Sequence, residues 1–158
     1  MLFDICVAAL PAQILYGLWM RSSDKTVSKD IQALSRKYYG MINKEPQSVL
    51  PFYVLSKNYD KDSGMSDLFI GGQEQFENLE MFEIPAGLYG KTTVKPKFGF
   101  LWGLAIGQAK RFFYTKWISH SGYGAVNMEY EYHTEKSIGK KPEIELHFAL
   151  EEKPRAQE

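Results

Sequence analysis

The residues whose types are best suited to binding or catalysis lie in one short run, Met128-Glu129-Tyr130-Glu131-Tyr132-His133. Side chains alternate between the two faces of a strand, so Glu129, Glu131 and His133, here called the acidic strip, share one face. Either this face meets water while the Met and Tyr side chains form core, or one carboxylate is buried. A buried carboxylate costs several kcal/mol unless it is paired, and a cationic ligand is one such partner.

Other kinds of site have less support in the sequence. A metal would need ligands beyond the acidic strip, but His120 and His147 are scattered and no HExxH spacing occurs, so we expect no metal. The single cysteine, Cys6, lies in an apolar run, which predicts a buried and inert thiol. The GxSxG spacing of a nucleophile elbow and the glycine pattern of a dinucleotide site are both missing from the sequence, and we expect no cofactor.

The charge balance and the hydropathy pattern argue against a nucleic-acid-binding or membrane-spanning protein. The 158 residues contain 19 Lys and Arg against 19 Asp and Glu, which argues against an electrostatic nucleic-acid binder. The first residues carry no basic region, and no apolar run approaches the roughly 20 residues that span a bilayer. With one cysteine and no disulfide, we expect a cytoplasmic chain with no direct nucleic-acid or membrane partner.

Aromatic residues are unusually frequent. Phe, Trp and Tyr make up 15% of the chain, with 10 Tyr. Two interpretations remain open: a core whose tyrosine hydroxyls reach the surface, or a binding site for flat or cationic ligands.

The first half of the chain predicts a strand, a helix and a hairpin. Residues 12–21 read as a strand, and residues 1–11 as a further strand or an ordered arm. Ser28 is the expected N-cap of an amphipathic helix over 29–42, because apolar residues follow at helical spacing. Strands are expected at 50–58 and 65–73 around the turn at 60–64.

The second half repeats this order. We expect a strand at 81–94 interrupted at 85–87, a helix at 98–117, and strands at 126–133 and 143–150. Gly99, Gly103 and Gly107 share a stripe of that helix, which either brings its backbone close to the sheet or only weakens it. The sequence therefore predicts one α+β domain over 1–158, with halves at about 1–75 and 76–152 and a charged tail at 151–158. The expected fold is two β-α-β-β repeats related by a pseudo-twofold axis: an antiparallel sheet, two helices on one face, and a ligand cleft between the halves.

Four motifs in this order resemble the gyrase-inhibitor-like family, also called AraC-type effector-binding domains. The motifs are the hairpin at 58–72, Phe82-Glu83-Ile84-Pro85-Ala86-Gly87-Leu88-Tyr89, the helix exit at 114–123, and Tyr130-Glu131-Tyr132-His133-Thr134-Glu135-Lys136. The resemblance covers about residues 12–150. The family includes the ligand-sensing halves of multidrug-responsive activators and free-standing drug-binding proteins of integron cassettes.

The resemblance implies a binding module for small, lipophilic, cationic drugs and dyes, which senses or sequesters them. It places Glu131 on the family's ligand-facing glutamate, with Glu129 as the alternative two residues away. His133 and Thr134 depart from the usual pattern. Aromatic residues from both halves either wall the cleft or form core, namely Trp19, Tyr53, Phe69, Tyr89 and Trp102.

Two other functions stay open at this point. Some members hydrolyse electrophilic small molecules with the pocket glutamate and a tyrosine, and the family name suggests a protein-binding inhibitor of DNA gyrase. The sequence shows no DNA-binding segment, so a role in transcription would need a regulator as partner.

Overall fold

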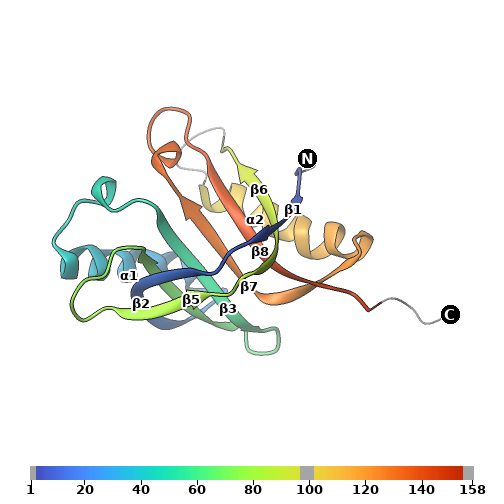
Figure 1. Cartoon of the computed structure of the whole chain (residues 1–158), viewed down its shortest axis with the longest axis horizontal. Coiled ribbons are helices and arrows are strands. Elements are labelled where there is room, and N and C mark those ends of the chain that lie inside the picture. Colours follow the sequence, from blue (N-terminus) through green and yellow to red (C-terminus); the bar gives the residue numbers. More distant parts are fainter. Residues whose placement is uncertain (1–2, 97–101, 155–158) are drawn as a thin grey trace.

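The computed structural model describes residues 3–96 and 102–154, and each half of the chain contributes four strands and one helix (Figure 1). The elements of the first half are β1 (Cys6–Leu10), β2 (Gln13–Ser23), α1 (Val27–Ile42), β3 (Phe52–Asp60) and β4 (Met65–Gly72). Those of the second half are β5 (Glu80–Ile84), β6 (Gly87–Val94), α2 (Trp102–Phe112), β7 (Tyr123–His133) and β8 (Ile144–Glu152). A π-helical turn at Phe113–Trp117 continues α2.

These strands form one antiparallel sheet in the order β1-β6-β8-β7-β3-β4-β2-β5. The two halves meet at the central β3–β7 pair, and the first strand of each half pairs with a strand of the other half. Thus β1 pairs with β6, and β5 pairs with β2. The predicted α+β fold, with an antiparallel sheet built from two repeats, is confirmed.

Both helices cover the same face of the sheet (Figure 1). The α1 cluster packs Leu34, Tyr38 and Ile42 against β-strand residues that include Phe52, Val54, Leu68 and Ile70. The α2 cluster packs Ala109 and Phe113 against Val94, Ile144, Leu146, Phe148 and Leu150. Since the α1 cluster includes residues of β3 and the α2 cluster residues of β8, the central strand β7 lies between the two apolar clusters.

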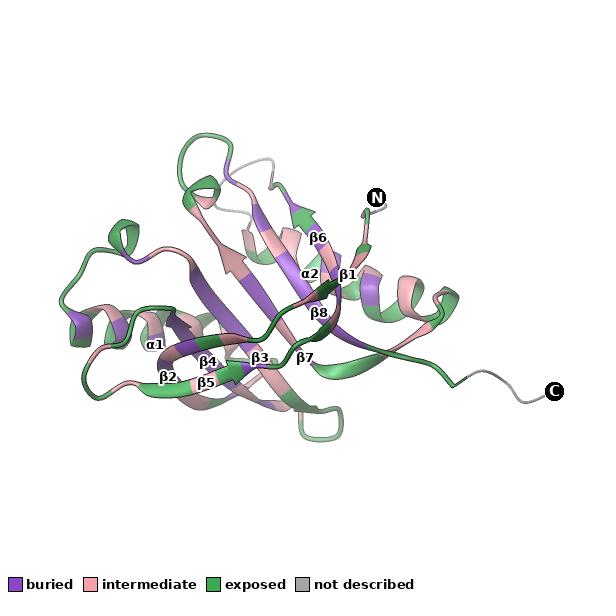
Figure 2. Cartoon of the chain, in the orientation of Figure 1, coloured by how far each residue is buried: buried purple, intermediate pink, exposed green. Residues whose placement is uncertain are grey.

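The opposite face of the sheet holds the third cluster, which is rich in tyrosine. It includes Leu15, Tyr53, Phe69, Tyr89 and Tyr130, each 2% exposed or less. Figure 2 shows the buried positions gathered on the central strands, whereas the edge strand β5 is largely exposed. Part of the tyrosine content therefore forms core, as one of the two interpretations stated.

Hydrogen bonds through Gln13 join two tyrosine hydroxyls of this third cluster, those of Tyr53 and Tyr130. The Tyr53 hydroxyl donates to Oε1 of Gln13 at 2.7 Å, and Nε2 of Gln13 donates to the Tyr130 hydroxyl at 3.3 Å. The Tyr130 hydroxyl in turn lies 2.7 Å from Nδ1 of His147. This chain of hydrogen bonds crosses from the first half of the sheet to the second.

The predicted interruption of the strand at 81–94 is confirmed, because Pro85 and Ala86 separate β5, which pairs with β2, from β6, which pairs with β1 and β8. The predicted start of the first helix was wrong. The first helix begins at Val27, so Ser28 is not its N-cap. Thr26 holds that position, and its hydroxyl donates to Oδ2 of Asp30 at 2.7 Å rather than to the first backbone groups.

The second helix and the cysteine also differ from expectation. The α2 helix runs from Trp102 to Phe112, whereas positions 98–101 of the predicted helix, Gly99 among them, lie outside the described residues. A Cβ atom added at Gly103 or Gly107 would meet nothing within 4 Å, so these two glycines do not bring the helix close to the sheet. Cys6 is exposed rather than buried, because it begins the edge strand β1.

Candidate functional site

The acidic strip lies on the helix-covered face of the sheet, between the two helices. Glu131 stands opposite Val54 on β3 and Leu146 on β8. Val54 belongs to the α1 cluster and Leu146 to the α2 cluster. Facing side chains on neighbouring strands point to the same side, so the strip runs along the line where the two clusters meet.

Both carboxylates are largely removed from water. The Glu131 side chain is 11% exposed and the Glu129 side chain 17%. Tyr130, on the other face of β7, is 2% exposed. The strand is thus covered on both faces, and the interpretation of the acidic strip as a solvated face is wrong.

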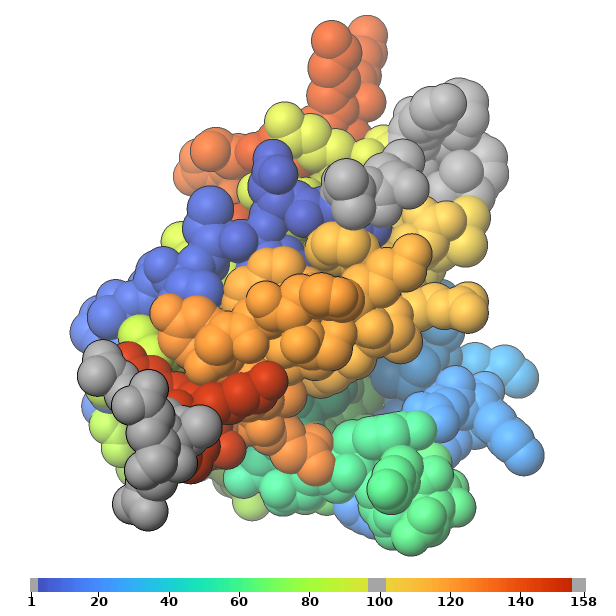
Figure 3. All heavy atoms as spheres, turned by 90° about the vertical axis from the view of Figure 1, so that its right-hand side faces the viewer, coloured from blue at the N-terminus to red at the C-terminus, as the bar shows by residue number. Residues whose placement is uncertain are grey.

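A cavity of about 760 Å³ opens beside Glu129. It lies between α2, the start of α1 and the β3–β4 hairpin. Figure 3 shows this side of the molecule, with α2 and the following turn in orange, the hairpin in green, and a hollow in the surface between them. The lining residues are Ser23, Asp24, Val27, Ser56, Tyr59, Lys61, Ser66, Lys110, Arg111, Tyr114, Ala125, Asn127, Met128 and Glu129.

Two strand irregularities shape the mouth of this cavity. The β3–β4 register shifts between Lys57 and Asp60, and the β7–β8 register shifts between Ala125 and Glu129. Across the gap, the Asn127 side chain accepts from the Tyr59 backbone N–H and donates to its carbonyl, both at 2.8 Å. The Asn127 amide therefore replaces a strand pairing and holds the hairpin against β7.

Glu129 is held by two side chains from the α2 segment. Nζ of Lys110 lies 3.2 Å from Oε1 of Glu129, and the Tyr114 hydroxyl donates to Oε2 at 3.2 Å. Burial alone would lower the pKa of Lys110, but the charges of Glu129 and Glu131 together raise it above its ordinary value. Burial, and then Glu129, raise the pKa of Tyr114, so the phenol stays protonated and donates.

Glu131 has a different partner. Its Oε1 lies 3.0 Å from Nε2 of His133, the third member of the acidic strip. Glu131 does not line the cavity, but its charge acts on Lys110. Lys110 thus contacts Glu129 at the cavity wall, and Glu131, which pairs with His133, influences the lysine through its charge.

The aromatic residues expected at the cleft lie elsewhere. Trp19, Tyr53, Phe69 and Tyr89 belong to the third cluster, on the face of the sheet opposite Glu131. Trp102 packs at the edge of the α2 cluster. The structure does not bring these five side chains together with the acidic strip.

The aromatic and basic residues that do reach the cavity were missed from the sequence. Tyr59 comes from the hairpin, and Lys110, Arg111 and Tyr114 from the α2 segment. One signal was available: Lys110 and Tyr114 lie four residues apart, and Ala109 and Phe113, one residue earlier, are the buried positions of that segment. A helical projection places a lysine and a tyrosine together beside the packed face.

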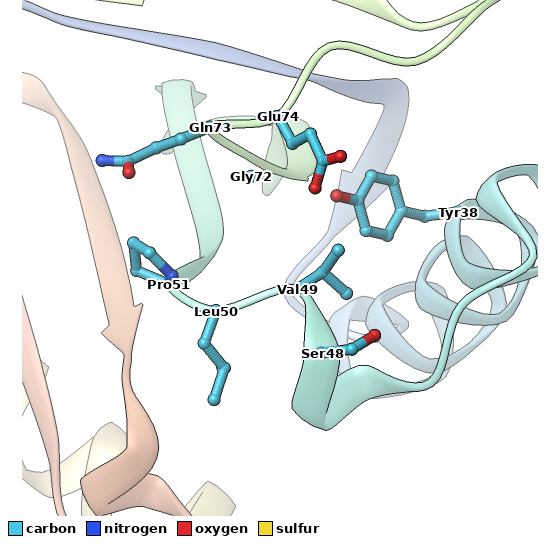
Figure 4. A pocket seen from close by; sticks show the side chains of 8 residues that line it. All are labelled: Tyr38, Ser48, Val49, Leu50, Pro51, Gly72, Gln73 and Glu74. Carbon is cyan, nitrogen blue, oxygen red and sulfur yellow. The ribbon is translucent and has the colours of Figure 1, made fainter.

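A second, smaller cavity of about 290 Å³ lies between Tyr38 of α1, the segment 48–51 and the residues at the end of β4 (Figure 4). The Tyr38 ring and the Glu74 side chain point toward each other there, and Val49 and Leu50 form part of the wall. The buried Tyr38 hydroxyl has no hydrogen-bond partner among the described residues. Burial, with the Glu74 charge, raises the pKa of Tyr38 to about 12.

Metal-binding clusters and membrane-spanning helices are both absent from the described part of the chain. Over 3–96 and 102–154, no three His, Cys, Asp or Glu side chains are grouped so that they would hold a metal ion. Within the same ranges, no helix has the length and apolar character needed to span a bilayer.

Comparisons with known proteins identify the fold. No family model and no curated protein sequence matches the chain. An integron cassette protein from the mobile metagenome of Vibrio cholerae, VCH_CASS2, superposes with a TM-score of 0.69 at 14% identity, over 94% of this chain and 97% of that one. SAV2435 bound to tetraphenylphosphonium gives a TM-score of 0.70 at 10% identity, over 94% of each chain.

A third solved structure, the C-terminal domain of EcmrR, gives a TM-score of 0.59 at 18% identity, over 96% of this chain and 99% of that domain. At these identities the likeness concerns the fold. The chain therefore has the gyrase-inhibitor-like, effector-binding fold.

Proposed function

We propose that this chain binds small, lipophilic cations in the 760 Å³ cavity and acts as a module that senses or sequesters them. One observation carries the proposal: two largely buried carboxylates, Glu129 and Glu131, lie on one face of β7, and Lys110 is the lysine that contacts Glu129, at 3.2 Å. The inner part of the site thus has an excess of negative charge. A ligand cation would balance that charge where water does so poorly.

Basic side chains at the mouth do not reverse this preference. Lys61 and Arg111 line the cavity but are exposed, as is Asp24. Exposed charges are screened by water and salt, so each contributes little to the affinity for a ligand. The buried charges beside Glu129 act through a less polar medium and dominate.

The walls suit a ligand with flat, apolar groups. Tyr59 and Tyr114 offer ring surfaces, and Val27 and Ala125 offer aliphatic ones. The volume falls within the ~300–1,000 Å³ typical of small-molecule sites. SAV2435, which has the same fold, was solved bound to tetraphenylphosphonium, a cation of this kind, and this supports the proposed ligand class.

Hydrolysis of an electrophilic small molecule is a second candidate, favoured by the contact between Tyr114 and Glu129. A glutamate and a tyrosine in contact are suited to activating water. Both oxygens of Glu129 already have partners, Lys110 and Tyr114, which disfavours a general base. Binding without turnover is therefore the primary proposal.

Three related compounds test the proposed ligand class. Calorimetric titration should show binding of tetraphenylphosphonium, much weaker binding of the neutral triphenylphosphine oxide, and weaker binding still of the anionic tetraphenylborate. Equal affinities for the cation and the neutral compound would contradict charge recognition. Tighter binding of the anion would assign the site to the basic side chains instead.

A blocking substitution tests the location. Ser56 faces Glu129 across the β3–β7 pair and lines the cavity. Ser56→Phe should fill that wall and weaken tetraphenylphosphonium binding, whereas Ser119→Phe, at an exposed position outside the cavity lining, should leave it unchanged. Unchanged binding by Ser56→Phe would place the ligand elsewhere.

A further inference from the structure

We propose that Lys110 is a built-in competitor at this site: its ammonium occupies the position that a ligand cation would take beside Glu129, and a ligand binds by displacing it. The inference rests on the proposed function. It adds a mechanism of selection, because the free protein already satisfies the carboxylate that recognises the ligand.

The geometry presents Glu129 to Lys110. The Tyr114 hydroxyl holds Oε2 at 3.2 Å, which leaves Oε1 toward Nζ of Lys110, also at 3.2 Å. Lys110 and Tyr114 are four residues apart on the α2 segment, so both act from one side of the cavity. The lysine thus stands where Glu129 meets the cavity, in the place a ligand cation needs.

Two properties of Lys110 favour its displacement: its side chain is partly exposed, and a second carboxylate lies near it. Its side chain is 31% exposed and ends a flexible four-carbon chain. The negative charge of Glu131 also attracts the ammonium. Together with Glu129 it raises the pKa of Lys110, although burial alone would lower that pKa. After displacement, the Lys110 ammonium still interacts with the carboxylate of Glu131. Displacement therefore costs less free energy than the complete loss of an ion pair.

This arrangement selects ligands by their apolar surface. At Glu129 itself, exchanging one cation for another gains little, because this carboxylate is paired before and after. Net affinity must then come from contacts of the ligand with Tyr59, Tyr114 and Val27. Small hydrophilic ammonium ions should fail to displace Lys110, whereas bulky lipophilic cations should succeed.

Removal of the competitor is the decisive experiment. Lys110→Met keeps an unbranched, flexible side chain and removes the charge, and Lys110→Gln is a second variant in case the first does not fold. Both should bind tetraphenylphosphonium about 10- to 100-fold more tightly than the unsubstituted protein, which is the range for one charge-assisted contact. Tetramethylammonium, which lacks apolar surface, should bind measurably to the variants alone.

Lys116→Met is the matched control, since Lys116 is exposed, lies on the turn after α2 and does not line the cavity. Its affinity should equal that of the unsubstituted protein, which separates a local effect from a change in net charge. Each folded variant is checked by circular dichroism before titration.

The outcomes separate the inference from the function on which it rests. If both Lys110 variants bind tetraphenylphosphonium as tightly as the unsubstituted protein or more weakly, Lys110 is not a competitor of the ligand. The proposed function is unaffected by that result. Binding that appears only when Lys110 is replaced supports both. Absence of binding in every variant overturns the proposed function and the inference with it.

Discussion

Nε2 of His133 and Oε1 of Glu131 lie 3.0 Å apart on one face of β7, between the clusters under the two helices. His133→Phe should therefore cost about 1–3 kcal/mol of stability, because it removes a hydrogen bond to a largely buried carboxylate. The new ring has a neighbour in Phe52, whose ring centroid is 6.0 Å from that of His133, so lost packing is not the expected cause. Urea denaturation at pH 7 measures the change.

The matched control for this prediction is the double variant Glu131→Gln with His133→Phe. If the unpaired carboxylate causes the loss, removing its charge should recover part of the stability. An unchanged stability in His133→Phe alone would mean that Glu131 does not depend on His133.

The buried imidazole of His147 predicts an acid-sensitive fold. Burial lowers the pKa of His147 to about 4, against the opposing charge of Glu145, from an ordinary value of 6.5. The unfolded chain then binds the proton more tightly than the folded one, so stability is full above pH 6.5 and is lost as the pH falls toward 4. The loss should be on the order of 2–3 kcal/mol.

Comparison with His147→Gln isolates this effect from other titrating groups. The amide oxygen of Gln is able to accept from the Tyr130 hydroxyl, as Nδ1 of His147 does across 2.7 Å when the imidazole is neutral. Melting curves between pH 4 and pH 7 should show a shallower pH dependence in the variant. Parallel curves for the two proteins would show that His147 does not titrate on unfolding.

The Tyr38 hydroxyl, beside the smaller cavity, predicts a stabilising substitution. This buried group has no hydrogen-bond partner among the described residues, and a buried unsatisfied group costs about 1–3 kcal/mol. Tyr38→Phe keeps the ring against Tyr39 and Phe52 and removes the hydroxyl. Its midpoint in urea should rise or stay equal, and a marked fall would reveal a partner for the hydroxyl.

The sequence predicted the elements whose signal is local. The amphipathic pattern placed the first helix within two residues of Val27–Ile42, and turn residues placed the hairpin around Gly64, which has a φ of 72°. The order of the elements was then enough to indicate the two-repeat fold.

The exchange of first strands between the halves was missed because strand partners are chosen by tertiary contacts. β1 and β5 are short, and nothing in either segment specifies which strand it pairs with. One clue was present: Leu10-Pro11-Ala12 and Ile84-Pro85-Ala86 break the chain at matching places in the two halves. Reading both as strand breaks predicts a β-β-α-β-β repeat.

The site was predictable only in part for a similar reason. Alternation along β7 put Glu129 and Glu131 on one face, which the structure bears out. It did not show on which face Trp19 or Tyr89 lies relative to those glutamates, because that depends on the registers of intervening strands. Lys110 joins the site through helix packing, which leaves no pattern within β7.

The measurement that tests the account most directly is the affinity of Glu129→Gln for tetraphenylphosphonium. Because Glu129 lines the cavity and carries the charge that a cation needs, the variant should bind at least about 10-fold more weakly, with Glu131→Gln showing a smaller loss. Glu80→Gln, on the exposed edge strand β5, should bind as the unsubstituted protein does. Equal affinity in Glu129→Gln and the unsubstituted protein would contradict the central claim that this carboxylate recognises the ligand.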